Sequence, residues 1–383
     1  MYSISGFGTM IADEVRMSAY ERALRGAVRP GSVVLDIGTG TGIFALLACQ
    51  FGARRVFAVE PDHAIEVARE IAAANGYLDR IEFMQELSTR ITLPERADVI
   101  VSDIRGILPL FQHHIPTIVD ARRRLLAPGG TLIPQCDVVQ VAVVEAPEHY
   151  RRHMGPWDGR PYGLDMRAAR EIVSNTWRRV RLAPEEHLLL EPQAWATLNY
   201  RMVENPNVDG ELTWTAARTG VGHGLLVWFD SSLIDDVDFS NAPTAPELIY
   251  GGAFFPWSSP VSIAIGDSVS VALHANLIGE DYMWRWNTVV LDQGQPGQEK
   301  ASFKQSTFFG APLSGARLRK QAANYVPRLT EDGQIDQWIL ALMADEMPLC
   351  EIAGRALERF PAHFADSQDA LTRVGALAQR YSR

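Results

Sequence analysis

The chain has 383 residues, of which 47% are apolar and 21% are charged, a composition that excludes the disordered, collagen-like and disulfide-rich classes. Its length favours two or three domains. The 46 acidic and 36 basic residues give a net charge of −10. Because no overall positive field attracts phosphates, we expect no nucleic acid as a partner.

The cysteines and the apolar runs indicate the compartment. Cys49, Cys136 and Cys350 lie far apart, which favours buried thiols in a reducing compartment over a metal site or disulfides. No apolar run approaches the roughly 20 residues that a membrane span needs, and no basic segment followed by an apolar block marks an export signal. We therefore expect a cytoplasmic protein with no membrane partner and no metal.

Three zones differ in their residue patterns. Residues 1–136 alternate short β-branched runs with helical stretches, residues 137–326 carry most tryptophans and little helical periodicity, and residues 327–383 are helical again. This order predicts an α/β protein with a Rossmann-like first domain, a β-rich, barrel-like second domain and a small helical C-terminal module.

The first zone alternates strands and helices. Apolar runs predict strands at 32–37, 55–60, 81–84, 97–102 and 131–134, and helical spacing predicts helices at 43–50, 64–75 and 115–126. Pro128-Gly129-Gly130 is expected to stop the last of these helices. Such alternation implies a mostly parallel sheet covered on both faces, with ligand sites at the carboxyl ends of its strands.

A glycine-rich turn, residues 38–42, follows the first predicted strand. Glycine has no Cβ and accepts positive φ, so a ligand can approach this backbone closely. A dinucleotide fingerprint would need a glycine three positions after Gly40, but Ile43 stands there, which disfavours an NAD-dependent oxidoreductase.

Glu60 ends the second predicted strand, where a carboxylate can accept both hydroxyls of an adenosine ribose. The glycine turn and this acid together favour S-adenosylmethionine as the cofactor. Taken singly, each feature has a purely structural explanation: the glycines would shape a tight turn, and Glu60 would cap the next helix. The whole set together favours the cofactor.

Several motifs resemble those of the protein arginine methyltransferases, a family of class I S-adenosylmethionine-dependent enzymes. Met10–Arg16 with Tyr20 matches the family's N-terminal motif, and Val34–Gly42 matches its glycine loop. Leu93-Pro94 before Ala97–Ser102 also matches, and the segments Val227–Asp230 and Gly266–Val269 are similar to its barrel domain. The resemblance covers residues 1 to about 290.

The resemblance implies a cofactor role for a set of residues. Arg16 would pair with the methionine carboxylate and Asp13 would hold Arg16 in place; a surface ion pair between these two residues is the alternative. The family's adenine-contacting acid falls near Ser88, where no acid stands, although Glu86 is close. The expected cofactor residues are Met10, Asp13, Arg16, Asp36, Gly38, Thr39, Gly40, Gly42, Ile43, Glu60, Pro61, Glu86, Leu87, Ser88 and Asp103.

The acceptor loop departs from the family. Two glutamates hold the substrate guanidinium there, but this chain has the shorter Asp103 and the neutral Gln112, with Arg105 between them. Each lost charge pair could cost a few kcal/mol, about what a partly desolvated pair contributes. The family's Thr-His-Trp segment aligns with residues 248–250, which lack the histidine. A neutral or anionic acceptor is therefore favoured over arginine.

The loop also offers catalytic groups. A carboxylate acceptor would need no base and could pair with Arg105, which could equally be a partner of Asp103. An amide or hydroxyl acceptor would need a base, for which Asp103, His113 or His114 could serve. Adjacent histidines on a helix point about 100° apart, so at most one should face the pocket, and a packing role is an alternative for each. The predicted catalytic set is Asp103, Arg105, Gln112 and His113.

The C-terminal module, residues 327–383, is weakly similar to the pyrroloquinoline quinone peptide chaperone, a winged-helix domain that recognises leader peptides. A helical cap that packs on the barrel or builds a dimer is the alternative. In the second zone, Tyr282, Trp284 and Trp286 alternate as one face of a strand and favour a core position.

These observations predict an S-adenosylmethionine-dependent methyltransferase that yields S-adenosylhomocysteine. Its acceptor would be N or O of a peptide or protein side chain, bound between a cofactor domain, 1–136, and an acceptor domain, 137–326. The family resemblance allows a homodimer. The second hypothesis is a protein that binds S-adenosylmethionine for regulation or structure and does no chemistry.

Overall fold

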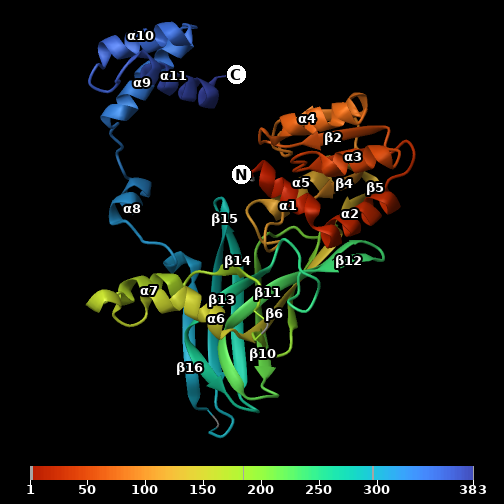
Figure 1. The fold of residues 1–383 in the computed structure, drawn as a ribbon, viewed down its shortest axis with the longest axis vertical. Helices are drawn as coiled ribbons and strands as arrows, with labels where there is room; N and C mark the ends of the chain where they lie inside the picture. The colour runs from red at the N-terminus through yellow and green to blue at the C-terminus, as the bar shows by residue number, and fades with distance from the viewer. Residues whose placement is uncertain (1–2, 184, 296, 383) are drawn as a thin grey trace. The chain divides into compact units, whose positions relative to one another are not determined.

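The computed structural model describes residues 3–183, 185–295 and 297–382, and the chain forms two compact units, Met1–Pro312 and Leu313–Arg383. The first unit opens with helices α1 (Ile4–Ala12) and α2 (Glu14–Ala27) and continues into a five-stranded parallel sheet of order β3-β2-β1-β4-β5 (Figure 1). The strands are β1 (Val33–Ile37), β2 (Arg55–Val59), β3 (Ile81–Met84), β4 (Ala97–Ser102) and β5 (Leu126–Ile133). The helices between them are α3 (Ile43–Gln50), α4 (Ala64–Ala74) and α5 (His114–Arg124).

This sheet is buried on both faces. Along β1, Val33, Leu35 and Ile37 belong to one apolar cluster, whereas Val34 belongs to another on the opposite face with residues of α2 and α3. Successive strand residues point to opposite faces, so continuous apolar runs are what two covered faces require. The predicted Rossmann-like domain is confirmed.

The fifth strand begins earlier than predicted. The helix before it ends at Arg124, and Pro128-Gly129-Gly130 lies inside β5 instead of ending the helix. Ala97 pairs with Leu126 and Val99 with Thr131, so a register shift absorbs the segment between them. A bulged strand tolerates proline and glycine. Reading these residues as a helix stop therefore placed the start of the fifth strand too late in the sequence.

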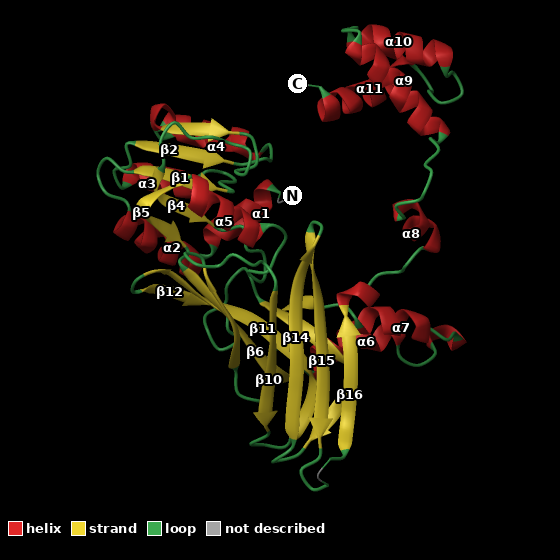
Figure 2. Cartoon of the chain, turned by 180° about the vertical axis from the view of Figure 1, so that it is seen from behind, coloured by secondary structure: helices red, strands yellow, loops and turns green. Residues whose placement is uncertain are grey.

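Two antiparallel sheets follow, as predicted for the barrel-like part (Figure 2). One has the order β7-β13-β11-β6-β8, with β12 beside β11 and β9 beside β6; the other has the order β10-β14-β15-β16. Tyr282, Trp284 and Trp286 lie buried on one face of β15, which confirms their core position. The strands are β6 (Cys136–Glu145), β7 (Arg178–Val180), β8 (His187–Leu188), β9 (Gln193–Asn199), β10 (Val208–Thr215), β11 (Gly220–Ile234), β12 (Val237–Ser240), β13 (Gly252–Ile263), β14 (Ser268–Ile278), β15 (Asp281–Leu291) and β16 (Glu299–Ser306).

Two helices in this zone were not expected from the sequence, α6 (Pro147–Met154) and α7 (Arg167–Ser174). Each is only eight residues long, shorter than the window of roughly 11–18 residues over which helical periodicity is recognised. In α6, Tyr150, His153 and Met154 are buried, which fixes the helix through tertiary packing.

The second unit is helical, with α8 (Gly315–Gln321), α9 (Glu331–Ala344), α10 (Leu349–Arg359) and α11 (Ser367–Tyr381). Its own apolar core joins Ile335 and Ile339 of α9 to Ile352 of α10 and Val374 of α11. The predicted boundaries near 136 and 326 stay predictions; β6 begins at Cys136, and the compact unit begins at Leu313.

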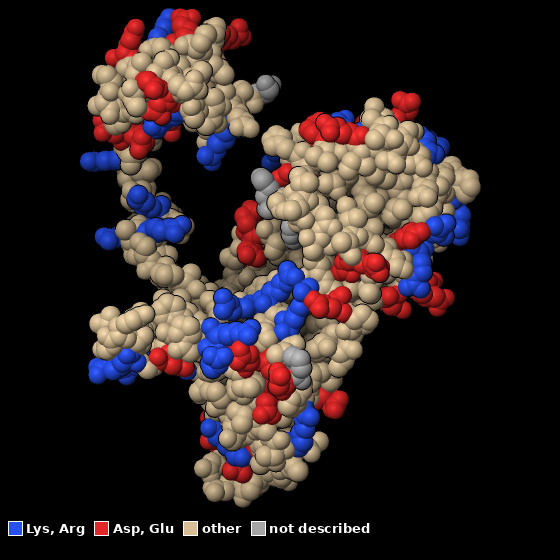
Figure 3. Space-filling view, in the orientation of Figure 1, with Lys and Arg blue, Asp and Glu red and all other residues tan. Residues whose placement is uncertain are grey.

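The described residues also show how surface charge is distributed and whether a membrane helix or a metal cluster is present. Figure 3 shows acidic and basic side chains interleaved on one face, with basic side chains gathered over the antiparallel sheets, although the net charge is −10. None of the helices in the described ranges is long and apolar enough to cross a bilayer. Within those ranges, no group of His, Cys, Asp and Glu side chains is placed to hold a metal.

Candidate cofactor and acceptor site

A cavity of about 910 Å³ opens at the carboxyl ends of β1, β2 and β4. Its walls come from the turn after β1, Glu60 and Pro61 after β2, the loop after β4, and Phe7 and Met10 of α1. β1 pairs with β2 on one side and with β4 on the other, so the strand order reverses at this point. A parallel sheet offers a ligand crevice at such a place.

The glycine turn is shaped by close packing. Gly38 and Gly40 have φ of 74° and 55°, and a Cβ at Gly40 would lie 2.4 Å from the Phe7 ring. Asp36 anchors the turn: its Oδ2 accepts hydrogen bonds from Thr39 Oγ1 at 2.6 Å and from Ala45 N–H at 3.1 Å. Burial raises the pKa of Asp36 to about 7. The turn therefore presents its backbone to the cavity while its carboxylate stays inside.

Glu60 ties two loops together at the cavity wall. Its Oε2 accepts from Gly40 N–H and its Oε1 from Asp62 N–H, each at 3.0 Å. Burial raises the pKa of Glu60. Since each carboxylate oxygen has further lone pairs, both can still accept hydroxyls from a ligand. Asp62 accepts from Ala64 N–H at the start of α4, so the capping role considered for Glu60 falls to Asp62.

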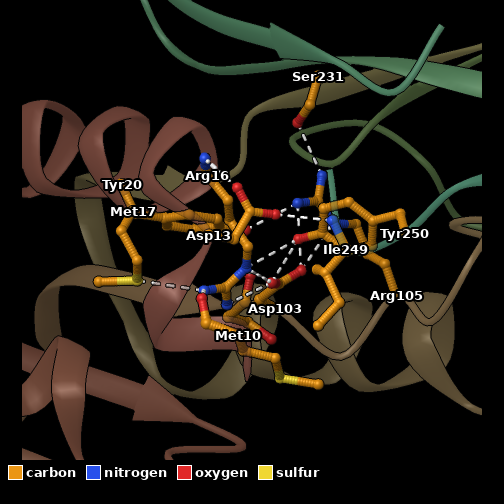
Figure 4. Close-up of polar contacts among 11 residues, drawn as sticks. Met10, Asp13, Arg16, Met17, Tyr20, Asp103, Arg105, Ser231, Ile249 and Tyr250 are labelled. Atoms are coloured by element: carbon orange, nitrogen blue, oxygen red, sulfur yellow. Dashed lines mark hydrogen bonds and ion pairs between the residues drawn. The ribbon is translucent and has the colours of Figure 1, made fainter. Parts of the chain in front are cut away.

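Arg16 lies in the first turn of α2, and its buried side chain contacts the loop after β4 (Figure 4). Its Nε and Nη2 contact Asp103 Oδ2 at 2.8 and 2.6 Å, and Tyr250 Oη donates to the same oxygen at 2.6 Å. Although burial opposes its ionisation, the charges of Arg16 and Arg105 hold the pKa of Asp103 at about 2. A guanidinium at the cavity wall fits the carboxylate of an amino-acid ligand.

Asp13 has another role than the resemblance implies. Its Oδ1 accepts from the backbone N–H of Arg16 at 3.0 Å and its Oδ2 from Ile249 N–H at 2.7 Å. It therefore caps α2 and joins that helix to the segment before β13, whereas Asp103 holds the Arg16 guanidinium. Asp103 is distant from Arg16 in the sequence, but the fold brings the loop after β4 against α2, so its carboxylate reaches the guanidinium.

Arg105 is fully buried and is not part of the cavity wall. Its Nη1 donates to Asp137 Oδ1 and Ser231 Oγ at 2.7 Å each, and its Nη2 donates to Tyr20 Oη at 2.8 Å. Its Nε also contacts Asp103 Oδ1 at 3.2 Å. Of the two roles considered from the sequence, partner of an anionic acceptor or partner of Asp103, the structure shows the second. Because Arg105 does not reach the cavity, an anionic acceptor cannot pair with it. Of the neutral and anionic acceptors favoured from the sequence, the anionic one is therefore wrong.

Gln112, His113 and His114 all line the cavity. The expectation that at most one histidine would face the pocket is wrong, because His113 precedes α5 and only His114 is inside it. His113 is half exposed, and its Nε2 lies 3.0 Å from Oε2 of the exposed Glu280. His114 is buried, with Nε2 3.0 Å from Tyr200 Oη.

Most of the predicted cofactor residues meet at the cavity. Those that line it are Met10, Arg16, Gly38, Thr39, Ile43, Glu60, Pro61, Glu86, Leu87, Ser88 and Asp103; Asp13, Asp36, Gly40 and Gly42 support it from behind. Tyr250, Asp137 and Tyr200 were not predicted. Asp137 follows Cys136 at the start of β6, ahead of a mostly apolar run, and that acid was the available signal.

The chain is similar to known proteins in sequence and in fold. The family model of the ribosomal protein L11 methyltransferase matches residues 7–139. Protein arginine N-methyltransferase 6 of Xenopus tropicalis is 29% identical over 250 residues, covering 62% of this chain and 74% of that protein. The zebrafish (Danio rerio) protein of that name is 31% identical over 57% of this chain and 66% of its own length. A probable Arabidopsis thaliana relative of that name is 27% identical, and the chain spans 55% of its length.

The fold is shared with solved structures. The Trypanosoma brucei PRMT1 enzyme–prozyme heterotetrameric complex with AdoHcy gives a TM-score of 0.71 at 20% identity, over 78% of this chain and 96% of that one. Arabidopsis thaliana protein arginine methyltransferase 10 gives 0.67 at 23% identity, over 79% and 97%. The chain therefore resembles the protein arginine methyltransferases in sequence and in fold, which confirms the resemblance predicted from its motifs.

Proposed function

We propose that this protein transfers a methyl group from S-adenosylmethionine to a neutral nitrogen or oxygen of a peptide or protein side chain, and that arginine is not its preferred acceptor. The observation that carries this proposal is the double pairing of Asp103. The carboxylate that would receive a substrate guanidinium already binds Arg16 and Arg105 and accepts from Tyr250.

The cavity suits the cofactor. The glycine turn can contact the adenosine, the free lone pairs of Glu60 can accept the ribose hydroxyls, and Arg16 can pair with the methionine carboxylate. When bound, the cofactor supplies an electrophilic methyl group on a sulfonium. The protein's own part is to place that group in line with the acceptor, which needs mainly position.

An arginine acceptor would have to displace existing pairs. Breaking a buried ion pair costs about 3–5 kcal/mol, and Gln112 offers no charge in return. The other acids of the cavity wall lie elsewhere: Glu60, Asp62 and Glu86 follow β2 and β3, and Glu280 is 92% exposed on its side chain. A neutral acceptor requires none of these pairs to break.

The cofactor assignment predicts the effect of Glu60→Ala. Because Glu60 both faces the ribose position and fixes Gly40, the change should weaken S-adenosylhomocysteine binding at least tenfold, or by about 1.4 kcal/mol or more. Isothermal calorimetry measures this directly. Glu66→Ala, an exposed acid of α4 outside the cavity wall, is the matched control. Equal affinities of the Glu60→Ala variant and the unchanged protein would refute the assignment.

The acceptor assignment predicts which peptides are methylated. With radiolabelled S-adenosylmethionine, pools of peptides rich in Asn and Gln or in Ser and Thr should take up label at least tenfold faster than an arginine-rich pool. Mass spectrometry then locates the methyl group. Abundant methylarginine would overturn the acceptor proposal, and tight cofactor binding without turnover on any pool would favour the regulatory alternative.

A further inference from the structure

One nitrogen of His114 has no partner. Among the described residues, a few buried side-chain polar atoms lack a hydrogen bond, and of these only His114 Nδ1 belongs to a residue of the cavity wall. A buried polar atom without a partner costs about 1–3 kcal/mol, so it calls for an explanation in function or in a bound group. The residue is 2% exposed and stands at the first position of α5.

The hydrogen-bond partners of His114 fix its tautomer. Tyr200 Oη donates its single proton to Asp137 Oδ2 at 2.5 Å, and Asp137 in turn is paired with Arg105 at 2.7 Å. The Tyr200 oxygen can then only accept from His114, so the ring proton is on Nε2. Nδ1 therefore carries a free lone pair. We name Asp137, Tyr200 and His114 the imidazole chain.

We propose that His114 is a catalytic residue of the methyl transfer: Nδ1 accepts a hydrogen bond from the N–H or O–H of the neutral acceptor and then takes its proton. Tyr200 and Asp137 act as positioning residues, because they hold the ring in the one tautomer that leaves Nδ1 unprotonated. This inference rests on the proposed function and names the group that meets its acceptor.

The step balances in atoms and charge. The acceptor heteroatom forms a bond to the methyl carbon while the carbon–sulfur bond breaks, and the bonding pair stays on sulfur, which becomes a neutral thioether. The acceptor's proton moves to Nδ1, and the positive charge passes from the sulfonium to the imidazolium. The proton leaves to water when the products dissociate, which restores the neutral ring.

The surroundings keep the ring neutral. Burial and the positive charge of Arg105 lower the pKa of His114 to about 3, with Asp103 opposing this shift. The lone pair is therefore available across the physiological range. A base this weak suffices because the acceptor proton becomes strongly acidic once its heteroatom shares electrons with the methyl group.

His113, the histidine of the predicted catalytic set, is the weaker candidate. Its side chain is 46% exposed, and its Nε2 contacts Glu280, whose side chain is 92% exposed. The Glu280 carboxylate can only accept, so it too places the ring proton on Nε2, but an exposed pair of this kind holds the ring weakly. Because His113 lines the cavity, the control is a histidine outside it, the half-exposed His187 of β8.

Nuclear magnetic resonance of the full chain with ¹⁵N-labelled imidazoles and bound S-adenosylhomocysteine tests the tautomer. We expect His114 to carry its proton on Nε2 and to show no titration between about pH 5 and pH 9, since burial and the charge of Arg105 lower its pKa to about 3; Asp103, Asp137 and Tyr200 are the other ionisable groups around it. Tyr200→Phe should mix the two tautomers. A proton on Nδ1, or titration near pH 6.5, would overturn the inference without touching the proposed function.

Turnover provides the second arm, on the peptide pool that the unchanged protein methylates fastest. His114→Gln should lower kcat by about a hundredfold or more, with unchanged S-adenosylhomocysteine affinity, whereas His187→Gln, at a half-exposed histidine of β8 outside the cavity wall, should stay within threefold. His114→Asn replaces His114→Gln if the latter does not fold. Retained turnover in the His114 variant refutes this inference alone; no turnover on any pool in the unchanged protein refutes the proposed function and this inference with it.

Discussion

Asp36 combines a raised pKa with complete burial and an Oδ1 that has no hydrogen-bond partner. Its folded-state pKa of about 7 exceeds the ordinary value of 3.8, so the folded state holds this proton more tightly than the unfolded state. The protonated Asp36 contributes its full share to the free energy of unfolding below the ordinary pKa of 3.8. This share is lost as the pH rises toward 7, because the unfolded chain then ionises at no cost.

Asp36→Asn should therefore change the pH dependence of stability. Relative to this variant, the unchanged protein should lose on the order of 3 kcal/mol of unfolding free energy between about pH 5 and pH 8. Urea unfolding at both pH values measures the difference, and groups that titrate in both proteins cancel. Asp79→Asn, an exposed acid, is the control and should show no such loss. A constant difference across the two pH values would contradict the buried-acid assignment.

Residues near one another in the chain were predictable, whereas pairings across the fold were not. Gly38, Gly40 and Glu60 follow predicted strands, and the topology of a parallel sheet places such residues at one edge. Arg105 gave no such signal, because its partners Asp137 and Ser231 come from strands of the antiparallel part. No local spacing encodes the position of β6 and β11 beside the loop after β4.

Among the elements, α1 is the one whose packing depends most on the cavity. The helix has no buried residue, yet Phe7, Met10 and Ile11 line the cavity wall, while Ile4 is 52% exposed. An element with so little buried surface opens at low free-energy cost. A ligand in the cavity would give its apolar side a surface to pack on, and α1 should then become harder to open.

Hydrogen exchange by mass spectrometry should detect this change. Amides of residues 4–12 should exchange at least tenfold more slowly after saturation with S-adenosylhomocysteine. Peptides from α10, whose apolar residues Ile352 and Ala353 belong to the core of the second unit, should not change and serve as the internal control. Equal exchange of α1 with and without the ligand would show that the helix does not cover the bound cofactor.

The elements also show where sequence patterns are informative. The four predicted strands before residue 103 lie where they were expected, because each is a buried run of β-branched and apolar residues between helices. The antiparallel strands could be anticipated only as a β-rich zone, since their boundaries follow long-range pairings such as Gly224 with Val144. The short helices α6 and α7 have eight residues each, too few for a periodic pattern to stand out, and α6 depends on the packing of its buried side chains.

At the scale of the whole molecule, net charge was a poor guide to the site. The value of −10 suits a cationic substrate, but the loop after β4 has its acid neutralised by two arginines. The electrostatics of a pocket depend on the few charges within it, and these were fixed by the fold.

The division into two units makes the last prediction. Every residue of the cavity wall lies between Phe7 and Glu280, and residues of the second unit have a separate apolar core. A chain that ends at Pro312 should therefore bind S-adenosylhomocysteine within twofold of the full chain's affinity, measured by calorimetry. Recognition of peptides by the second unit stays a prediction from the sequence; if it holds, the same truncation should raise KM for the preferred peptide pool and leave kcat unchanged. A loss of cofactor affinity on truncation would instead show that the second unit stabilises the cofactor site, because a unit that acts only on the peptide cannot change the binding of a ligand in the absence of that peptide.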